Sequence, residues 1–347
     1  MERKLVILTE GRSTVMAAKT AVSVIRYCTE SVVAVLDSTV SERTTQELFG
    51  VGGDIPVVGS LVDAPEANTL VIGIATAGGK LPPEMRAYVL EAIRKGMNVE
   101  SGLHTFLCDD EEFSREAAAS GSVLRDIRKN NEKDVAVRRN IREDCLRIHS
   151  VGHDCSIGKM VSTIELTRAL KAMGEDAKFV ATGQTGILIE GDGCPVDCVV
   201  SDFVNGAAEK LVLANQHHDI LIVEGQGSLA HPSFSAVTLG LLHGVIPQGL
   251  IFCYEAGRTA VKGLEHVAIP PMRAIMDLYL ASANIMRPCR FIGIGMNSRN
   301  LTDEEYTEEK ARVAAEFGLP VCDPIREGAE PLAEAVLRLR DELELKS

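Results

Sequence analysis

Short apolar runs rich in β-branched residues alternate with longer segments of helical periodicity along the whole 347-residue chain. Such alternation is typical of βαβ units, because a strand can pair in parallel with its predecessor only after a long crossover, usually a helix. We therefore predict an α/β protein with mostly parallel sheets. The length favours two domains, since one domain commonly holds ~100 to 200 residues.

The expected elements form two groups with a charged stretch between them. Expected strands are 5–8, 32–36 and 70–74, then 146–151, 178–181, 220–224, 250–254 and 290–294. Expected helices are 15–27, 42–49, 83–95, 159–173, 203–217, 303–317 and 330–345, the last closing the outer face of a sheet. Residues 128–143 are rich in charge, as in a linker or a solvated helical connection. We predict domains at 1–140 and 141–347.

Composition argues against several classes of partner. There are 36 Lys and Arg against 49 Asp and Glu, so the net charge of -13 repels nucleic acid and anionic membranes. Aromatic residues make up only 4% of the chain, which leaves few platforms on which bases can stack. The longest apolar run, 239–254, is interrupted by polar residues and is shorter than the ~20 residues of a membrane helix. We expect a small-molecule substrate, with no nucleic acid and no membrane partner.

The opening stretch, MERKLVILTEGR, has an apolar run too short for a secretory signal. Nine cysteines dispersed over a chain of this size do not resemble the disulfide framework of a small secreted domain. We therefore expect a cytoplasmic protein with reduced thiols. A homo-oligomer is also expected, because symmetric association is common among soluble enzymes.

The strongest functional signal is the loop G-H-D-C-S-I-G-K at 152–159, between an expected strand and an expected helix. Such a loop directs backbone N–H groups and the positive end of a helix at an anion, and its lysine adds a full charge. Five rather than four residues separate the glycines, and Met160 stands where a P-loop has the Ser or Thr that binds magnesium. We predict a phosphate-binding site formed by Gly152, Asp154, Cys155, Ser156, Gly158, Lys159 and Met160.

A second candidate is the carboxylate that ends the strand-like run in ILIVEGQG, residues 220–227. Glu224 can act as a general base or hold a metal, and the glycines after it let a ligand approach closely. His231 follows near the same edge, where a neutral imidazole can take a proton from an amine; a packing role is the alternative. The predicted catalytic residues are Glu224, His231 and Lys159, with Glu224 and Asp154 as ligands only if magnesium is used.

Polar residues follow other expected strands. The run T-G-Q-T-G at 182–186 offers hydroxyl and amide groups to a polar ligand, whereas Asp202 can bind a ligand or cap the next helix. Asn297 can pair with a nucleobase edge or form a turn. Arg258 can clamp a substrate carboxylate, as can Arg273 and Arg287. The predicted substrate-binding residues are Thr182, Gln184, Thr185, Asp202, Gln226 and Arg258.

In the first domain, Asp37 lies where a dinucleotide fold holds a ribose. The first turn nevertheless lacks the G-x-G-x-x-G fingerprint. The sequence therefore does not predict a nicotinamide-dependent dehydrogenase.

Seven segments together resemble one family of bacterial and archaeal proteins long described as a domain of unknown function: SGLHTFLCDD, DIRK, VGHDCSIGKM, ATGQTGILI, SDFVNGAAE, VEGQGSLAHPSFSAVTLGLLHG and CDPIREG. The resemblance runs nearly end to end. It implies a Rossmann-like N-terminal domain and a P-loop NTPase-like C-terminal domain similar to dethiobiotin synthetase. It also implies the activity of some members, which acetylate D-glutamate with acetyl-CoA. The family's loop commonly reads G-T-D-C-A-V-G-K-M, so His153 is the departure and Met160 is not.

Three functional hypotheses follow. The leading one is an N-acetyltransferase that moves an acetyl group from acetyl-CoA to the amino group of an acidic amino acid, D-glutamate first, while the P-loop holds the CoA phosphates. The second is a ligase or kinase that uses ATP with Mg and resembles dethiobiotin synthetase, with Asn297 reading adenine. The third is a non-catalytic nucleotide-binding module. All three place a phosphate-bearing ligand at 152–159.

Overall fold

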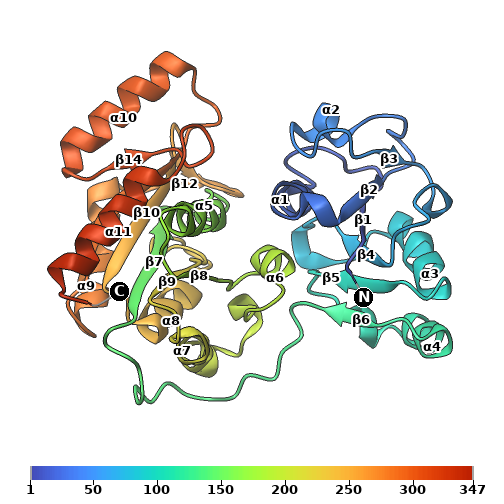
Figure 1. Cartoon of the computed structure of the whole chain (residues 1–347), viewed down its shortest axis with the longest axis horizontal. Coiled ribbons are helices and arrows are strands. Elements are labelled where there is room, and N and C mark those ends of the chain that lie inside the picture. Colours follow the sequence, from blue (N-terminus) through green and yellow to red (C-terminus); the bar gives the residue numbers. More distant parts are fainter. Residues whose placement is uncertain (1, 346–347) are drawn as a thin grey trace. The chain divides into compact units, whose positions relative to one another are not determined.

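The computed structural model describes residues 2–345, and the chain divides into two compact units (Figure 1). The first unit holds the chain up to Lys129 together with the short segment Ile187–Asp192. The second holds Asn130–Gly186 and the chain from Gly193 onward. Each unit has its own sheet, so each is described by itself.

The first unit is built on a parallel six-stranded sheet in the order β3-β2-β1-β4-β5-β6. Its strands are β1 (Leu5–Leu8), β2 (Val32–Leu36), β3 (Val57–Val58), β4 (Thr69–Ile72), β5 (Asn98–Ser101) and β6 (Leu124–Asp126). Its helices are α1 (Lys19–Tyr27), α2 (Thr45–Phe49), α3 (Arg86–Arg94) and α4 (Glu111–Ser120). The strand order is that of a doubly wound nucleotide-binding fold, which confirms the predicted Rossmann-like domain.

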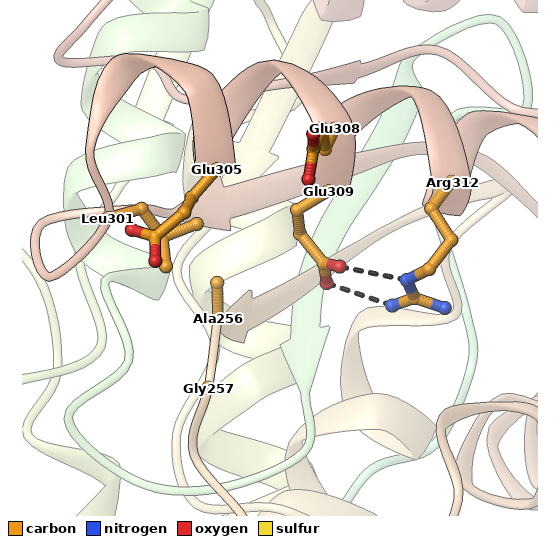
Figure 2. A pocket seen from close by; sticks show the side chains of 7 residues that line it. All are labelled: Ala256, Gly257, Leu301, Glu305, Glu308, Glu309 and Arg312. Atoms are coloured by element: carbon orange, nitrogen blue, oxygen red, sulfur yellow. Dashed lines mark hydrogen bonds and ion pairs between the residues drawn. The ribbon is translucent and has the colours of Figure 1, made fainter.

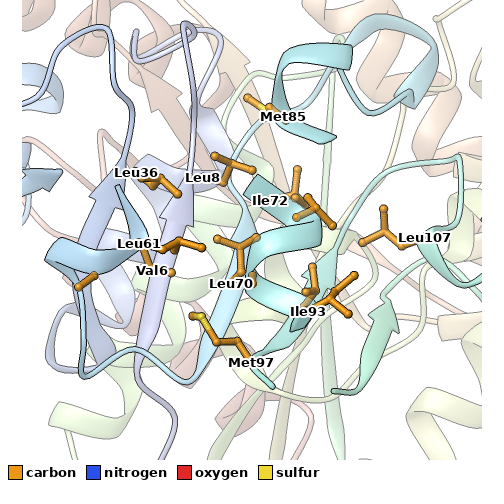
Figure 3. Packing of buried hydrophobic residues seen from close by; sticks show 14 of the residues in the cluster. Val6, Leu8, Leu36, Leu61, Leu70, Ile72, Met85, Ile93, Met97 and Leu107 are labelled. Carbon is orange, nitrogen blue, oxygen red and sulfur yellow. The ribbon is translucent and has the colours of Figure 1, made fainter. Parts of the chain in front are cut away.

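One hydrophobic cluster of this unit lies against one face of the sheet (Figure 3). Successive side chains of a strand point to opposite faces, so Val6 and Leu8 of β1 share a face with Leu70 and Ile72 of β4. They pack there against Ile93 of α3. All four β1 residues are buried, as expected of a strand covered on both faces.

The second unit also has a parallel six-stranded sheet, in the order β14-β13-β10-β7-β9-β8. Its strands are β7 (Leu146–Gly152), β8 (Ala177–Val180), β9 (Ile220–Val223), β10 (Gly249–Glu255), β13 (Arg290–Asn297) and β14 (Val321–Cys322); a separate hairpin is formed by β11 (Ala260–Val261) and β12 (Leu264–Ala268). Its helices are α5 (Lys159–Ala172), α6 (Gln184–Glu190), α7 (Val204–Asn215), α8 (Ser235–Val245), α9 (Met272–Asn284), α10 (Asp303–Phe317) and α11 (Glu330–Glu342). The last four residues of α6, 187–190, belong to the first unit.

Helices cover both faces of the second sheet. Helices α5 and α11 pack on one face, so the prediction that the last helix closes a face of the sheet is confirmed. Helices α7, α8, α9 and α10 pack on the other face. Strands β7, β9, β10 and β13 run parallel, so their carboxyl ends meet at one edge, where ligands bind in open α/β sheets.

The charged stretch between the units contains no helix or strand from Ile127 to Cys145, so the alternative of a helical connection is wrong. It is held instead by α7. The backbone N–H groups of Val137 and Arg138 donate to the buried Glu209 carboxylate at 2.9 and 2.8 Å. A carboxylate that accepts two backbone hydrogen bonds satisfies donors that a helix would otherwise have paired internally.

Some element bounds differ from expectation. Helix α1 begins at Lys19 rather than at Val15, and the apolar Val15 and Met16 side chains are about half exposed. The strand expected at 70–74 is β4, which covers Thr69–Ile72. Among the helices of the described chain, none combines the length and apolar character needed to span a lipid bilayer.

The α11 interface gives a stability prediction. Leu332 is fully buried, and its Cδ2 would lie only 2.5 Å from a Cβ at Gly293. We expect Leu332→Ala to lower the free energy of unfolding by about 2 to 5 kcal/mol, because it leaves a cavity under α11. Leu343→Ala, where the side chain is 42% exposed, should change it by less than about 0.5 kcal/mol. Urea unfolding measures both, and equal losses in the two variants would contradict this packing.

Candidate active site

The glycine loop joins the central strand β7 to helix α5. Gly152 ends the strand, and a Cβ there would lie 2.4 Å from the Cys253 carbonyl oxygen of β10, so the close approach of the two strands requires glycine. Gly158 has φ of 106° and precedes the first residue of α5, a left-handed conformation that glycine adopts at little cost. No side chain of the described residues caps this helix, so its first-turn N–H groups face the loop and suit an anion.

Lys159 places a positive charge inside this loop. Its side chain is buried, and Nζ donates to the Asp154 carbonyl oxygen at 2.7 Å. Burial lowers the pKa of Lys159, while the nearby Asp154 and Glu224 carboxylates favour the charged form. A phosphate oxygen would be a strong partner for this ammonium and for the helix N-terminus beside it.

Asp154 is fully buried, and three N–H donors satisfy its carboxylate. Oδ1 accepts from the Cys155 backbone at 2.7 Å, and Oδ2 accepts from Arg258 and from the Lys262 backbone, both at 2.9 Å. Burial alone would raise the pKa of Asp154, but these hydrogen bonds outweigh it and lower the pKa. Asp154 therefore fixes the loop to the segment that follows β10.

Arg258 makes several hydrogen bonds to the loop. Besides Asp154, it donates to the Cys155 carbonyl oxygen at 2.8 Å, and it forms an ion pair with the buried Glu255. The sequence predicts a substrate clamp at Arg258, whereas the structure joins this guanidinium to the loop. The other two arginines considered as clamps also have partners: Arg273 donates to the Glu316 carbonyl oxygen and Arg287 pairs with Glu143.

Glu255 is a site residue that the sequence analysis missed. It ends strand β10, and its carboxylate accepts from Arg299 at 2.9 and 3.0 Å as well as from Arg258. Its backbone N–H donates to His153 Nε2 at 3.1 Å, and burial lowers the pKa of His153 to about 4, so that ring is neutral. The signal was present in the sequence, because Glu255 ends an apolar run in the same way as Glu224.

Glu224 lies at the carboxyl end of β9 and is 4% exposed. Its Oε2 accepts from the backbone N–H groups of Thr182 and Gly183 at 2.9 and 3.0 Å. Burial nevertheless raises the pKa of Glu224 to about 7, since the loss of hydration outweighs these hydrogen bonds. A carboxyl group that titrates near neutral pH can both accept and return a proton.

Gly225 makes this arrangement possible. Its N–H donates to Ser150 Oγ at 2.9 Å, and a Cβ there would lie 1.8 Å from the Ser150 carbonyl oxygen and 3.0 Å from Lys159 Cδ. Any side chain at this position would therefore displace either β7 or the loop lysine. The glycine brings Glu224 and Lys159 to the same edge of the sheet.

His231 is 3% exposed, and its contacts define its tautomer. Nδ1 accepts from the Ser233 backbone N–H at 3.0 Å, so the proton of the neutral ring lies on Nε2. Burial lowers the pKa of His231, which keeps the ring neutral. Nε2 is buried, lies 3.7 Å from Asp154 Oδ1 and has no hydrogen-bond partner among residues 2–345. His231 thus presents a hydrogen-bond donor toward the glycine loop.

Five of the remaining predicted residues form hydrogen bonds with other residues of the second unit or with one another. Thr182 donates to the Glu224 carbonyl oxygen at 2.9 Å, and Gln226 donates to Thr182 Oγ1 at 3.2 Å. Asn297 donates to the Ile157 carbonyl oxygen at 3.3 Å, which places it beside the loop. At the start of α6, Gln184 Nε2 donates to Thr185 Oγ1 at 2.6 Å.

Asp202 lies apart from this network in the described contacts. It is exposed in a short turn, Ser201–Phe203, that precedes α7. The N-cap of α7 is Phe203, and no side chain of the described residues caps that helix. The prediction that Asp202 caps the helix is therefore wrong, because the helix begins one residue later than a cap at Asp202 requires.

The donor set does not fit a magnesium ion held as in a P-loop NTPase. Met160 has no oxygen at the position of the magnesium-binding hydroxyl. Both carboxylate oxygens of Asp154 and Oε2 of Glu224 already accept hydrogen bonds from the chain. The ligand atoms of Asp154, Cys155 and His231 lie within 4.8 Å of one another, but Arg258 would repel a cation there.

A separate cavity of about 450 Å³ lies between the end of β10 and helix α10 (Figure 2). In its wall, the Glu309 carboxylate accepts two hydrogen bonds from Arg312, both of 2.8 Å. Glu305 and Glu308 add two further carboxylates. Three carboxylates against one guanidinium do not suit an anionic ligand, so this cavity is a poor candidate for the predicted phosphate site.

A glycine loop between a parallel strand and a helix, with a buried lysine at the start of that helix, defines a P-loop protein. A family model described as "Domain of unknown function (DUF1611_C) P-loop domain" matches residues 134–333. A second, "Domain of unknown function (DUF1611_N) Rossmann-like domain", matches residues 38–130. The chain belongs to the DUF1611 family, as the resemblance implied, and both predicted domain types are confirmed.

Two relatives in this family are named "D-glutamate N-acetyltransferase". The protein from Tritonibacter scottomollicae is 38% identical over 274 residues, which are 79% of this chain and 82% of the relative. The protein from a Pseudoalteromonas species is 38% identical over 77% of this chain and 80% of the relative. A crystal structure of a DUF1611 family protein from Anabaena variabilis has a TM-score of 0.90 at 36% identity, covering 97% of this chain and 99% of that one.

The pKa of Glu224 gives a prediction about stability. From pH 4.5 to about 7 the folded state retains a proton that the unfolded state has released, so the free energy of unfolding falls as pH rises through this window. Glu224→Gln cannot titrate and should lack this fall. At about 1.4 kcal/mol per pKa unit, the wild type should lose about 3 kcal/mol relative to the variant across the window. Urea unfolding from pH 4.5 to 8 measures the difference, and parallel curves would contradict a raised pKa.

Proposed function

We propose that this protein transfers the acetyl group of acetyl-CoA to the amino group of D-glutamate. The observation that carries the proposal is the 38% identity, over more than three-quarters of the chain, to two relatives named for this activity. The glycine loop supports it, because coenzyme A carries a pyrophosphate that such a loop can hold. The methionine at position 160 favours CoA over ATP with magnesium, since it offers no ligand for the metal.

In this proposal, Lys159 and the first-turn N–H groups of α5 bind the CoA phosphates. Asp154 and Arg258 keep the loop in shape, because their ion pair joins it to the chain after β10. The buried carboxylate–guanidinium contact restrains both partners, so the loop needs little reorganisation when a phosphate binds.

Glu224 is the better candidate for the general base. An α-ammonium group must lose a proton before its nitrogen can attack a thioester. The pKa of Glu224 is raised to about 7, so at neutral pH much of it is ionised and basic enough to take that proton. His231 is disfavoured as the base, because its one unprotonated nitrogen already accepts from the Ser233 backbone.

His231 instead suits the role of donor. Its buried Nε2–H points toward the glycine loop and has no acceptor among residues 2–345. A neutral imidazole in such a position can stabilise the oxyanion that forms when an amine attacks a carbonyl carbon. The tautomer that excludes His231 as the base is the one that makes it a donor.

In the proposed reaction, Glu224 takes one proton from the ammonium group, and the freed nitrogen attacks the thioester carbonyl carbon. The N–C bond forms and the C–S bond breaks as the tetrahedral oxyanion collapses. The second proton that the nitrogen gives up neutralises the departing CoA thiolate, and Glu224 releases the first proton to water. The products are an N-acetylated amino acid, CoA and one proton.

The direct test is an end-point assay with the purified protein. Acetyl-CoA is incubated with D-glutamate, L-glutamate or D-aspartate, and the products are identified by mass spectrometry and thiol release. We expect N-acetyl-D-glutamate and one CoA thiol per product. Unchanged acetyl-CoA, together with ATP consumed only in the presence of magnesium, would support the ligase or kinase alternative instead.

If Lys159 binds the CoA phosphates, its removal should affect the reactions with two acetyl donors to different extents. Lys159→Ala should weaken acetyl-CoA binding at least about 100-fold, because a charge-assisted contact to a phosphate is worth about 3 kcal/mol. It should leave the reaction with acetyl-pantetheine, which has no phosphate, nearly unchanged. Lys171→Ala, exposed in the last turn of the same helix, serves as the matched control. Equal losses with both donors would show that Lys159 acts on the chemistry and not on the phosphates.

The base assignment predicts a pH profile. With Glu224 as the base, kcat/KM should rise with pH through an apparent pKa near 7 and then level off. Glu224→Gln should lower kcat about 100- to 10,000-fold and remove the rise. Glu308→Gln, the same change at an exposed position of α10, should retain full activity. A Glu224→Gln enzyme with an unchanged profile would rule Glu224 out as the base.

A further inference from the structure

A second cavity, of about 360 Å³, lies at the opposite edge of the same sheet from the glycine loop. Its walls are Arg147 at the amino end of β7, part of the connection before β7, and the turns before β10 and β13. The lining residues are Arg138, Asn140, Ile141, Glu143, Arg147, Ile246, Met286, Arg287 and Pro288. Three are arginines and one is acidic, in a protein whose net charge is -13.

Arg147 is the deepest of these arginines, and only 1% of it is exposed. Its guanidinium donates to the carbonyl oxygens of Ile246, Arg142 and Cys145 at 3.1, 2.9 and 3.0 Å. Within residues 2–345 it makes no ion pair with a carboxylate. A buried charge normally has an opposite charge beside it, because the loss of hydration is costly. Burial and, after it, the like charge of Arg287 lower the pKa of Arg147 to about 10, although Glu143 acts in the opposite direction.

Arg287 is also incompletely satisfied. One of its terminal nitrogens pairs with the Glu143 carboxylate at 2.8 Å, but the Glu143 side chain is 76% exposed, so water screens this contact. Its Nε is buried and has no hydrogen-bond partner among residues 2–345. Arg138 contributes a third guanidinium to the cavity wall. The cluster therefore carries two positive charges that no described carboxylate balances.

Three residues that line the cavity have strained backbone conformations. Ile246, a β-branched residue, has φ of 49°, and Arg138 and Asn140 have φ of 53° and 62°. These three are among six non-glycine residues with positive φ in the described chain, and all three line the cavity. Such conformations persist where surrounding contacts enforce them, and they are common at ligand-binding sites.

We propose that this cavity binds a small dianion, a dicarboxylate or a phosphate ester, at a site separate from the glycine loop. Arg287 Nε has no acceptor among residues 2–345, so its guanidinium can donate to a negatively charged oxygen in the cavity, and the buried Arg147 adds a second positive charge to the same wall. The apolar side chains of Ile141, Ile246 and Met286 would contact the carbon skeleton of the ligand. The cavity volume is within the range of small-molecule sites.

Thermal denaturation with two probes tests this proposal. Glutarate and inorganic phosphate are each titrated into the full-length protein at constant ionic strength, with chloride as the reference anion. Four proteins are compared: wild type, Arg287→Gln, Lys159→Ala and Arg290→Gln. Arg290 is an exposed arginine that pairs with Glu342 outside the cavity, so its variant has the same change of charge.

We expect at least one probe to raise the melting temperature of the wild type by a few degrees, in a concentration-dependent way. The rise should persist in Lys159→Ala and Arg290→Gln and disappear in Arg287→Gln. Whether glutarate or phosphate gives the larger rise identifies the class of dianion. Should Arg287→Gln fail to fold, Arg138→Gln, at an exposed position of the same wall, replaces it.

Two results would overturn the proposal. A rise that is lost in Lys159→Ala but kept in Arg287→Gln would place the anion in the glycine loop. No rise in the wild type with either probe at concentrations up to about 50 mM, well above the Kd of a functional metabolite site, would leave Arg147 as a purely structural group that binds three carbonyl oxygens.

Discussion

The site depends on how the chain accommodates one buried cation, the ammonium of Lys159. It lies at the start of α5, at the edge where four parallel strands end. A lysine removed from water is stable only if neighbouring groups replace its hydration. The Asp154 carbonyl oxygen does so directly, and the carboxylates of Asp154 and Glu224 act at longer range. The electrostatic properties of this edge follow from that arrangement.

Two neighbouring buried carboxylates have pKa values that are shifted in opposite directions. Asp154 accepts three hydrogen bonds, one of them from an arginine, so its pKa is lowered and it stays ionised as a fixed part of the loop. Glu224 accepts two backbone hydrogen bonds and, among residues 2–345, none from an arginine, so burial dominates and raises its pKa to about 7. Two chemically similar groups thereby acquire different roles, one structural and one suited to proton transfer.

The position of the glycine loop and of Glu224 at the ends of strands could be predicted from the sequence, because their signals are local. The loop 152–159 needs only a strand, two glycines and a lysine in order, and Glu224 needs only the end of an apolar run. Contacts between distant segments could not be predicted. The pairing of Arg258 with Asp154 depends on where the chain after β10 lies relative to the glycine loop. The tautomer of His231 depends on the conformation of the turn that contains Ser233. Strands β3 and β14 have two residues each and no periodicity to detect.

We propose that the glycine loop holds the phosphates of acetyl-CoA without a metal. Calorimetric titration of the intact protein with acetyl-CoA and with ATP, each in EDTA and in magnesium chloride, tests it most directly. We expect saturable acetyl-CoA binding with the same Kd in both buffers, because Lys159 and the α5 N-terminus need no magnesium. Binding of ATP only in magnesium, with no binding of acetyl-CoA, would contradict it.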